Sequence, residues 1–340
     1  MAYDLELSAK EIPFRTLIKL YIKRAKEIES YLSKRPDEWG KFQSEFNAEV
    51  NGVFRNIMNF EKVNLADGHE DRVYKLKRLF INRIRKIFVR GVYIEWSLRK
   101  PFGYAGDFKI IDDIYCNNPT TQGFDRLFDN YFQMSAISVA VRNRKEDLKR
   151  FIADFAKQRN NAKLRIMDLA CGPSRDIKEN LYENKTLLKN VVFDCYDNNA
   201  QAIEVAENML KDFPNVNFFK ENALRIAFRK DTSNVIGKKY DLIFSAGLFD
   251  YFTERVAIRL VEGLKKLLKP EGTLFIANVR DKYSNPSVHF MEWVGEWNLI
   301  YRDDNAFSKI FLDAGFKANQ LKLNYEQQGI IQYMWALNNK

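Results

Sequence analysis

Two acidic residues, each at the end of a short apolar run, constrain this chain more than any other feature. The run Leu164–Met167 leads into Asp168, and Gly172 follows four residues later, just before a helix-favouring segment. Val191–Tyr196 leads in the same way into Asp197 and a second helical segment. Apolar runs that alternate with helices indicate a parallel sheet, and an acid that ends the second strand can accept both hydroxyls of a ribose. The pattern predicts an α/β fold that binds a nucleoside-type ligand beside Gly172.

The glycines of this loop indicate which nucleoside is bound. Dinucleotide sites use the pattern G-x-G-x-x-G, because the pyrophosphate approaches the backbone at several points. Here Ala170 and Ser174 stand where further glycines would be, and Gly172 is the single glycine of the loop. S-adenosyl-L-methionine (SAM) has no phosphate, so one glycine is enough to let its methionine part lie across the loop.

Residues 164–279 resemble a class I SAM-dependent methyltransferase, which has a Rossmann-like sheet of seven strands. Asp168-x-Ala170-x-Gly172 resembles the first motif of that family, and Asp197 resembles its ribose acid. Ala170 replaces a more common glycine and Asn222 a more common aspartate, although an amide oxygen can still accept from an adenine amino group. The resemblance implies SAM as cofactor, held by Asp168, Ala170, Cys171, Gly172, Pro173, Asp197, Asn198, Asn222, Ala223, Ser245, Ala246 and Gly247.

Composition narrows the class of protein. With 340 residues, of which 46% are hydrophobic, the chain can bury one large core and a second smaller one. No apolar run reaches the roughly 18 residues of a membrane span, and the N-terminus lacks the apolar stretch of a signal peptide. Cys116, Cys171 and Cys195 show no CxxC spacing. We therefore expect a cytoplasmic protein with neither disulfides nor a metal site, whose oligomeric state the sequence leaves open.

Hydrophobic periodicity divides the chain into two expected domains. Residues 1–135 carry apolar residues at helical spacing in three long stretches, and we interpret them as a helical cap or substrate domain. Residues 136–340 begin with a helix and then alternate strand and helix, as expected of the methyltransferase domain. Residues 316–325 and 329–337 are typical of a terminal hairpin. The predicted fold is α/β, a Rossmann-like seven-stranded sheet with an N-terminal helical domain.

The net charge of +10 is concentrated in one segment. Residues 72–100 hold ten lysines and arginines and a single acid, Glu95. Such a segment is either a solvated helix face, a surface that steers an anionic partner, or a nucleic-acid contact. The segment lacks the signatures of known RNA-binding modules. The tetrapeptide of DNA-adenine methyltransferases is also absent after the expected fourth strand, where Gly247-Leu-Phe-Asp250 stands. A nucleic-acid partner is therefore not favoured, but the sequence leaves it open.

Two further segments supply candidates for the amino-acid end of the cofactor. In Lys100-Pro-Phe-Gly-Tyr104-Ala-Gly-Asp107-Phe108, two glycines surround a Tyr-Ala pair. This segment is either a structural corner whose Asp107 caps the next helix, or a lid in which Tyr104 presents a hydroxyl and a flat face. Arg144 falls on the buried face of an amphipathic helix. A buried arginine needs a carboxylate, either that of SAM or that of a protein acid.

The segment 280–303 follows the expected fifth strand, where open α/β sheets bind their ligands. Its mix of aromatic residues and a few polar groups is typical of a pocket for a partly apolar substrate. We expect it to wall the acceptor site, with Arg302 or the Tyr104 hydroxyl orienting the acceptor. His289 and Glu292 are the other candidate catalytic residues, His289 acting as a base if the acceptor is protonated. A purely structural role for His289 stays open.

The outer segments 101–108, 140–144 and 290–303 resemble a bacterial methyltransferase group known for making 3-hydroxypalmitic acid methyl ester, a cell-density signal called extracellular factor. This resemblance implies methyl transfer to a fatty-acid carboxylate, which is already ionised at neutral pH and needs no strong base. We predict a SAM-dependent methyltransferase that O-methylates a small or lipid-like acidic molecule. The rival hypotheses are an RNA methyltransferase and a non-catalytic SAM-binding module.

Overall fold

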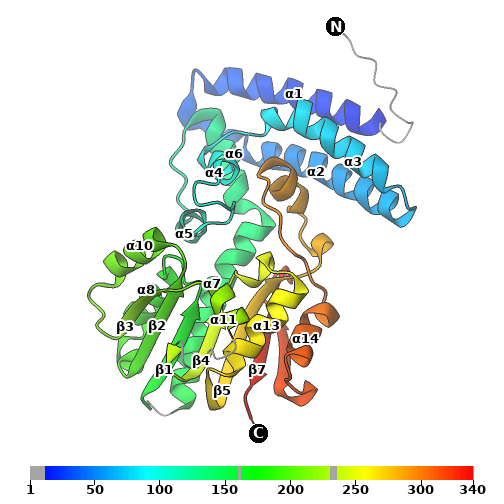
Figure 1. The fold of residues 1–340 in the computed structure, drawn as a ribbon. Helices are drawn as coiled ribbons and strands as arrows, with labels where there is room; N and C mark the ends of the chain where they lie inside the picture. The colour runs from blue at the N-terminus through cyan, green and yellow to red at the C-terminus, as the bar shows by residue number, and fades with distance from the viewer. Residues whose placement is uncertain (1–11, 160–161, 230–235, 340) are drawn as a thin grey trace. The chain divides into compact units, whose positions relative to one another are not determined.

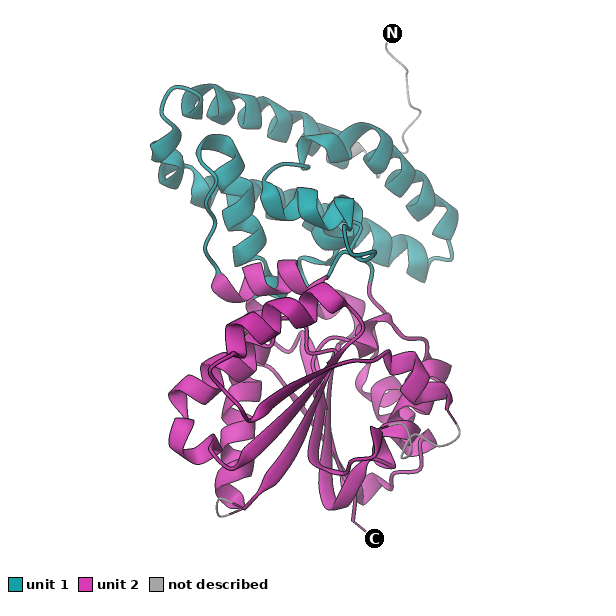
Figure 2. Ribbon diagram, turned by 60° about the vertical axis from the view of Figure 1, so that its left-hand side comes forward, with its two compact units in different colours: residues 1–106, 117–138, 285–298 teal, residues 107–116, 139–284, 299–340 magenta. Residues whose placement is uncertain are grey.

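The computed structural model describes residues 12–159, 162–229 and 236–339, and these form two compact units (Figure 2). A helical unit contains the described residues up to 106 together with residues 117–138 and 285–298. A sheet unit contains residues 107–116 and the described parts of 139–284 and 299–340. The units are interleaved along the chain, so each is built from segments that lie far apart in sequence. A division of function at residue 135 stays a prediction.

The sheet unit confirms the predicted seven-stranded Rossmann-like fold (Figure 1). The strand order is β3-β2-β1-β4-β5-β7-β6; β7 runs antiparallel to both β5 and β6, and the other neighbours are parallel. The expected terminal hairpin is present as β6 and β7. The strands are β1 (Leu164–Leu169), β2 (Val191–Asp197), β3 (Val216–Lys220), β4 (Tyr240–Ser245), β5 (Leu268–Val279), β6 (Leu321–Tyr325) and β7 (Ile331–Leu337).

Helices cover both faces of this sheet, as the alternation of side chains along β5 shows. Leu274 and Ile276 belong to the core that α11, α13 and α14 complete. Phe275, between them, points to the opposite face and stacks on Phe151 of α7, with ring centroids 5.6 Å apart. The helices of this unit are α5 (Phe108–Cys116), α7 (Ala136–Gln158), α8 (Arg175–Glu183), α9 (Lys185–Leu188), α10 (Ala200–Leu210), α11 (Ala223–Phe228), α13 (Glu254–Lys265) and α14 (Asp304–Asp313), with short helices at Phe249–Tyr251, Lys282–Ser284 and Ala318–Gln320.

The helical unit has an aromatic core. Phe46, Phe54 and Phe80 are fully buried. The distant segment 285–298 adds Phe290, whose ring lies 5.4 Å from that of Phe54, and Trp293, 5.5 Å from Phe80. Phe290 and Trp293, part of the segment expected to wall the acceptor site, are instead buried in the core of this unit. The elements are α1 (Ile12–Leu32), α2 (Gln43–Ala66), α3 (Glu70–Leu79), α4 (Val92–Arg99) and α6 (Gly123–Met134), with short helices at Pro36–Lys41, Phe80–Ile84, Arg85–Ile87 and Phe290–Val294.

Among the residues that the structure describes, no helix is both long and apolar enough to cross a membrane. No group of three or more His, Cys, Asp or Glu side chains among them is arranged to hold a metal ion.

Candidate functional site

The loop after β1 has an unusual backbone. Ala170, Gly172 and Ser174 all adopt left-handed conformations, with φ of +60°, +52° and +51°. The N–H groups of Ala170 and Cys171 donate to one carbonyl oxygen of β2, at 2.8 and 3.1 Å, which holds the loop against that strand. The side chains of Cys171 and Pro173 are buried. A left-handed alanine or serine costs about 1–2 kcal/mol, and such strain is typical of ligand-binding loops.

Asp197, at the end of β2, joins this loop to the second strand. One carboxylate oxygen accepts a hydrogen bond from the N–H of Gly172 at 2.9 Å, and the other accepts from the N–H of Asn199 at 2.8 Å. Asn199 in turn caps α10 with its side chain, and Asn198 beside it is exposed. The N–H of Asn198 is a third backbone donor to this carboxylate, and a lone pair remains that can accept a ribose hydroxyl.

Buried acids gather at the carboxyl ends of β1 and β2. Burial raises the pKa of Asp168 well above its ordinary value, and the nearby Asp176 and Asp197 add smaller repulsive contributions. Burial likewise raises the pKa of Asp176 and of Asp197. Asp168 is only 3% exposed. A positively charged ligand would relieve this repulsion, and SAM carries an ammonium and a sulfonium group.

Arg144 of α7 lies in the same unit, and only 6% of it is exposed. Its Nη1 donates to the carbonyl oxygen of Ala246 at 2.5 Å and its Nη2 to the hydroxyl of Tyr115 at 3.3 Å. Its Nε is buried without a hydrogen-bond partner, and no described carboxylate lies within the 4.0 Å of an ion pair. A Cβ atom on Gly247 would lie 3.3 Å from Nη1, so the glycine permits this close approach. The described acids that interact electrostatically with this guanidinium, Asp250 and Asp176, form no ion pair with it, so Nε keeps its capacity to bind an external carboxylate.

The remaining predicted cofactor residues lie at neighbouring strand ends. The hydroxyl of Ser245, at the end of β4, donates to the carbonyl oxygen of Leu169 in β1 at 2.8 Å. Asn222 caps α11, its side-chain oxygen accepting from the N–H of Leu224 at 2.8 Å, and Ala223 is buried. A contact between Asn222 and the adenine stays a prediction. Such a contact would use the second lone pair of the side-chain oxygen or the amide nitrogen.

Three of the four candidate catalytic residues, Tyr104, His289 and Glu292, belong to the helical unit. Tyr104 is 36% exposed, and Glu292 is buried. His289 is fully buried; its Nε2 lies 3.0 Å from a carboxylate oxygen of Glu61, and its Nδ1 has no hydrogen-bond partner. Sequence reasoning missed Glu61, although an acid four residues after Ile57 on the apolar stripe of α2 is a usable signal. These contacts favour a positioning role for His289, and its role as a base stays a prediction.

Arg302, the fourth candidate, belongs to the sheet unit and has other partners there. Its Nη1 donates to the carbonyl oxygen of Phe249 at 2.9 Å and also to the side-chain oxygen of Asn278. Its Nη2 donates to the carbonyl oxygen of Phe252. Arg302 thus clamps the short helix 249–251 from both ends. This arrangement favours a structural role, and orientation of an acceptor by Arg302 stays a prediction.

Asp250, at the centre of that short helix, was missed by the sequence reasoning. Its Oδ1 accepts from the N–H of Val279 at 2.7 Å and from the amide of Asn278 at 2.8 Å. Burial, opposed by the Val279 N–H and by Arg144, raises the pKa of Asp250 to about 6. The signal available was an acid following the fourth strand, but only the fold shows that it is buried.

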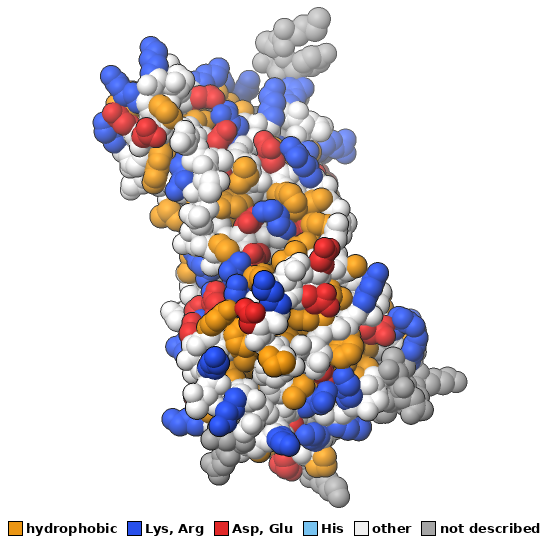
Figure 3. Space-filling view, turned by 90° about the vertical axis from the view of Figure 1, so that its left-hand side faces the viewer, with side chains coloured by type: hydrophobic (Ala, Val, Ile, Leu, Met, Phe, Trp, Pro, Cys, Tyr) orange, Lys and Arg blue, Asp and Glu red, His pale blue; other side chains and the backbone are white. Residues whose placement is uncertain are grey.

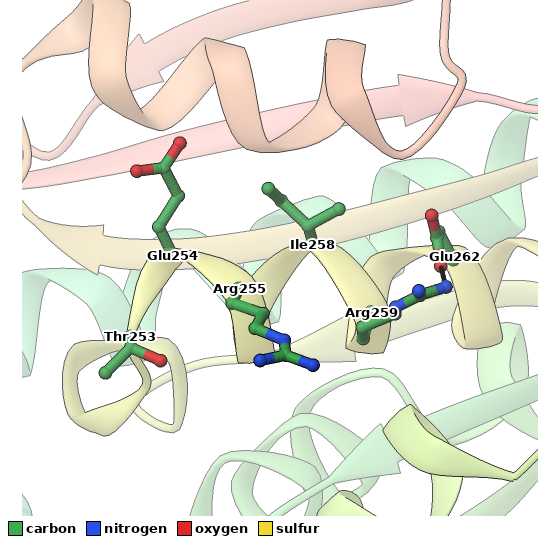
Figure 4. Close-up of a pocket in the computed structure, with 6 residues that line it drawn as sticks. All are labelled: Thr253, Glu254, Arg255, Ile258, Arg259 and Glu262. Atoms are coloured by element: carbon green, nitrogen blue, oxygen red, sulfur yellow. Dashed lines mark hydrogen bonds and ion pairs between the residues drawn. The ribbon is translucent and has the colours of Figure 1, made fainter.

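A separate pocket of about 530 Å³ lies on the outer side of α13 (Figure 4). In it, Arg259 and Glu262 form an ion pair at 3.0 Å. None of the predicted cofactor residues lines this pocket. Its lining residues are Thr253, Glu254, Arg255, Ile258, Arg259 and Glu262.

The fold and the loop together define the class of protein. A methyltransferase-domain family model matches residues 160–334, half of the chain, so the chain belongs to the methyltransferase-domain family. The matched region is a SAM-dependent methyltransferase domain, and the cofactor of such a domain is S-adenosyl-L-methionine. The family assignment favours an enzyme over the non-catalytic module considered from sequence.

One curated relative and one solved structure are similar to the chain. Malonyl-[acyl-carrier protein] O-methyltransferase 1 of Ilyobacter polytropus is 28% identical over 176 residues, which make up 51% of this chain. The match covers 55% of that relative's length, so the chain spans about half of the curated relative it matches. The crystal structure of a possible exported protein from Bordetella parapertussis has a TM-score of 0.56 at 14% identity, covering 78% of this chain and 96% of that one. The likeness to this structure extends to the fold alone.

Proposed function

We propose that the chain transfers the methyl group of SAM to an oxygen atom of a small or lipid-like acidic molecule. The observation that carries this proposal is the curated relative, which is an O-methyltransferase acting on malonyl-acyl carrier protein, an acceptor with a free carboxylate. The resemblance of segments 101–108, 140–144 and 290–303 to the group that makes 3-hydroxypalmitic acid methyl ester supports a fatty-acid carboxylate.

The cofactor contacts in this proposal come from the sheet unit. Asp197 accepts the ribose hydroxyls, Asp168 accepts from the ammonium group, and Arg144 donates its buried Nε to the carboxylate. Gly172 lets the backbone approach, and Asn222 contacts the adenine. The acid-rich strand ends and the unpartnered guanidinium nitrogen support this orientation, because they match the positive and negative ends of one amino acid.

The acceptor chemistry needs no strong base if the acceptor is a carboxylate, since that group is ionised at neutral pH. The contribution of the protein is then to hold the acceptor in line and to exclude water. Arg302, the candidate that belongs to the sheet unit, is proposed to orient the acceptor. The buried contact of His289 with Glu61 supports a structural role for His289 over proton transfer.

The basic segment supports a small acceptor over RNA. Arg85 and Lys100 pair with Glu296, while Arg90 pairs with Glu29 and Asp125. On the face drawn in Figure 3, Lys and Arg side chains are interspersed with Asp and Glu side chains. A surface that binds phosphates along a nucleic acid needs uncompensated charge.

The test is to incubate the protein with methyl-labelled SAM and, separately, a fatty-acid pool, a small-phenol pool and an RNA pool. The proposal predicts label in the fatty-acid pool that mild alkali releases as methanol, because esters are cleaved and ethers are not. Label in RNA alone would overturn the small-molecule assignment. Label that resists alkali would move the acceptor atom from a carboxylate to a hydroxyl.

A further inference from the structure

Helix α5 belongs to the sheet unit, although its chain neighbours on both sides, up to residue 106 and from residue 117, belong to the helical unit (Figure 2). Asp107 fixes its start: one carboxylate oxygen accepts from the N–H groups of Lys109 and Ile110, at 3.0 and 3.1 Å. This is the capping role considered for Asp107 from sequence. On the inner side of α5, Ile110 and Ile114 are buried. An element of nine residues is thus held on the sheet unit apart from its neighbours.

Two side chains of α5 contact the cofactor machinery. The Cβ of Phe108 lies 3.6 Å from the point where a Cβ on Gly172 would be, so Phe108 covers one side of the glycine loop. The hydroxyl of Tyr115 accepts from Nη2 of Arg144 at 3.3 Å. Burial raises the pKa of Tyr115, so the phenol stays protonated and keeps its own hydrogen to donate. The position of α5 therefore affects both the loop and the guanidinium.

A bidentate ion pair connects α5 to the helix that follows the loop. Nε and Nη2 of Arg175, the first residue of α8, donate to Oδ1 and Oδ2 of Asp112, the second bond measuring 2.8 Å. Both side chains are 22% exposed. Two parallel bonds between a guanidinium and a carboxylate fix orientation as well as distance. Since a helix of this length is marginal by itself, such a contact has a large effect on whether α5 stays in place.

We propose that Asp112 and Arg175 are positioning residues that hold α5 against the cofactor loop, and that opening of this pair sets the rate at which the cofactor product leaves. The pair acts through Phe108 on the loop and through Tyr115 on Arg144. The inference concerns the cofactor side alone and does not depend on the identity of the acceptor. Because the ion pair is partly exposed, it can open while the buried side chains of α5 stay packed.

The test measures dissociation of S-adenosylhomocysteine by stopped-flow displacement, with the full chain. Asp112→Asn keeps the shape of the side chain and removes its charge, and dissociation should become about five- to tenfold faster, the scale of a good but partly exposed ion pair. Arg175→Lys keeps the positive charge but loses the two parallel hydrogen bonds of the guanidinium. Its dissociation rate should therefore lie between those of the wild type and Asp112→Asn. The matched control is Arg259→Gln, which breaks the ion pair on α13 and should leave the rate unchanged.

Two further readouts separate positioning from general destabilisation. The melting temperature of the ligand-free protein should change little in Asp112→Asn, while amide hydrogen exchange in α5 should become faster. The double variant Asp112→Arg with Arg175→Asp should recover part of the slow dissociation. An unchanged dissociation rate in Asp112→Asn would overturn the proposal. So would faster dissociation without faster exchange in α5, because the effect would then not pass through the helix.

Discussion

Replacing Arg144 by leucine tests the account of the cofactor site at its most specific point. The guanidinium is buried, donates to two neutral oxygens, and keeps Nε without a partner. Hydrogen bonds to charged groups contribute about 1.5–3 kcal/mol, so loss of the bonds to the SAM carboxylate should weaken binding roughly 10- to 100-fold.

The same change should affect the ligand-free protein much less. Removing Arg144 leaves the carbonyl oxygen of Ala246 and the hydroxyl of Tyr115 without a donor, which costs about 1–3 kcal/mol. It also removes the desolvation penalty of a buried cation that forms no ion pair with a described carboxylate, and the two effects oppose each other. A leucine additionally contributes apolar burial at a site that is already closed to water.

The assay pairs isothermal calorimetry of S-adenosylhomocysteine with thermal unfolding of the ligand-free protein. Arg150→Leu, on the exposed side of the same helix, is the matched control and should leave the affinity unchanged. A loss of affinity without a matching loss of melting temperature is the expected result. Wild-type affinity in Arg144→Leu, together with a large drop in melting temperature, would refute the reasoning and make the arginine a structural residue.

Three other perturbations follow from the geometry. Asp197→Ala should weaken SAM binding by roughly 1.5–3 kcal/mol, because it removes the ribose acceptor and the anchor of the Gly172 N–H; unchanged calorimetry would argue against the ribose assignment. Ala170→Gly relieves a φ of +60° and should raise the free energy of unfolding in urea by up to about 1 kcal/mol, whereas a decrease would show that the loop is not strained there. Folding raises the pKa of Asp250 from 3.8 to about 6. Protonation of Asp250 therefore stabilises the folded protein fully below pH 3.8, and this stabilisation is lost as the pH rises through 6. Asp250→Asn should therefore gain stability over the wild type across that range, by at most about 3 kcal/mol, and a pH-independent difference between the two would contradict the shift.

Local pattern was sufficient to predict the sheet. Short apolar runs set the strands that contain Asp168 and Asp197: β1 continues one residue beyond Asp168, to Leu169, and β2 ends at Asp197. The terminal hairpin follows from alternation along two short segments. These features depend on neighbours in sequence, which is why a single chain carries enough information to predict them.

The interleaving of the two units depends on contacts between residues that lie far apart in the sequence. The hydrophobic pattern of a short segment does not predict such contacts. Asp112 meets Arg175 across 63 residues, and His289 meets Glu61 across 228. Residues 107–116 have the same helical pattern as the segments before and after them in the chain. They were therefore expected in the helical domain. Arg302 was expected to face an acceptor because of its position after the fifth strand, and only the folded chain shows the carbonyl groups that it binds. The sequence identified the chemistry of these side chains but not their partners.

A crystal structure of the protein with S-adenosylhomocysteine would show which residues hold the cofactor. We expect the ligand carboxylate within hydrogen-bonding distance of Nε of Arg144, below about 3.2 Å, and the ribose hydroxyls on the carboxylate of Asp197. The methionine part should then pass along the loop at Gly172, beneath Phe108. A ligand bound elsewhere, or one whose carboxylate leaves Nε of Arg144 unpartnered, would contradict this expectation.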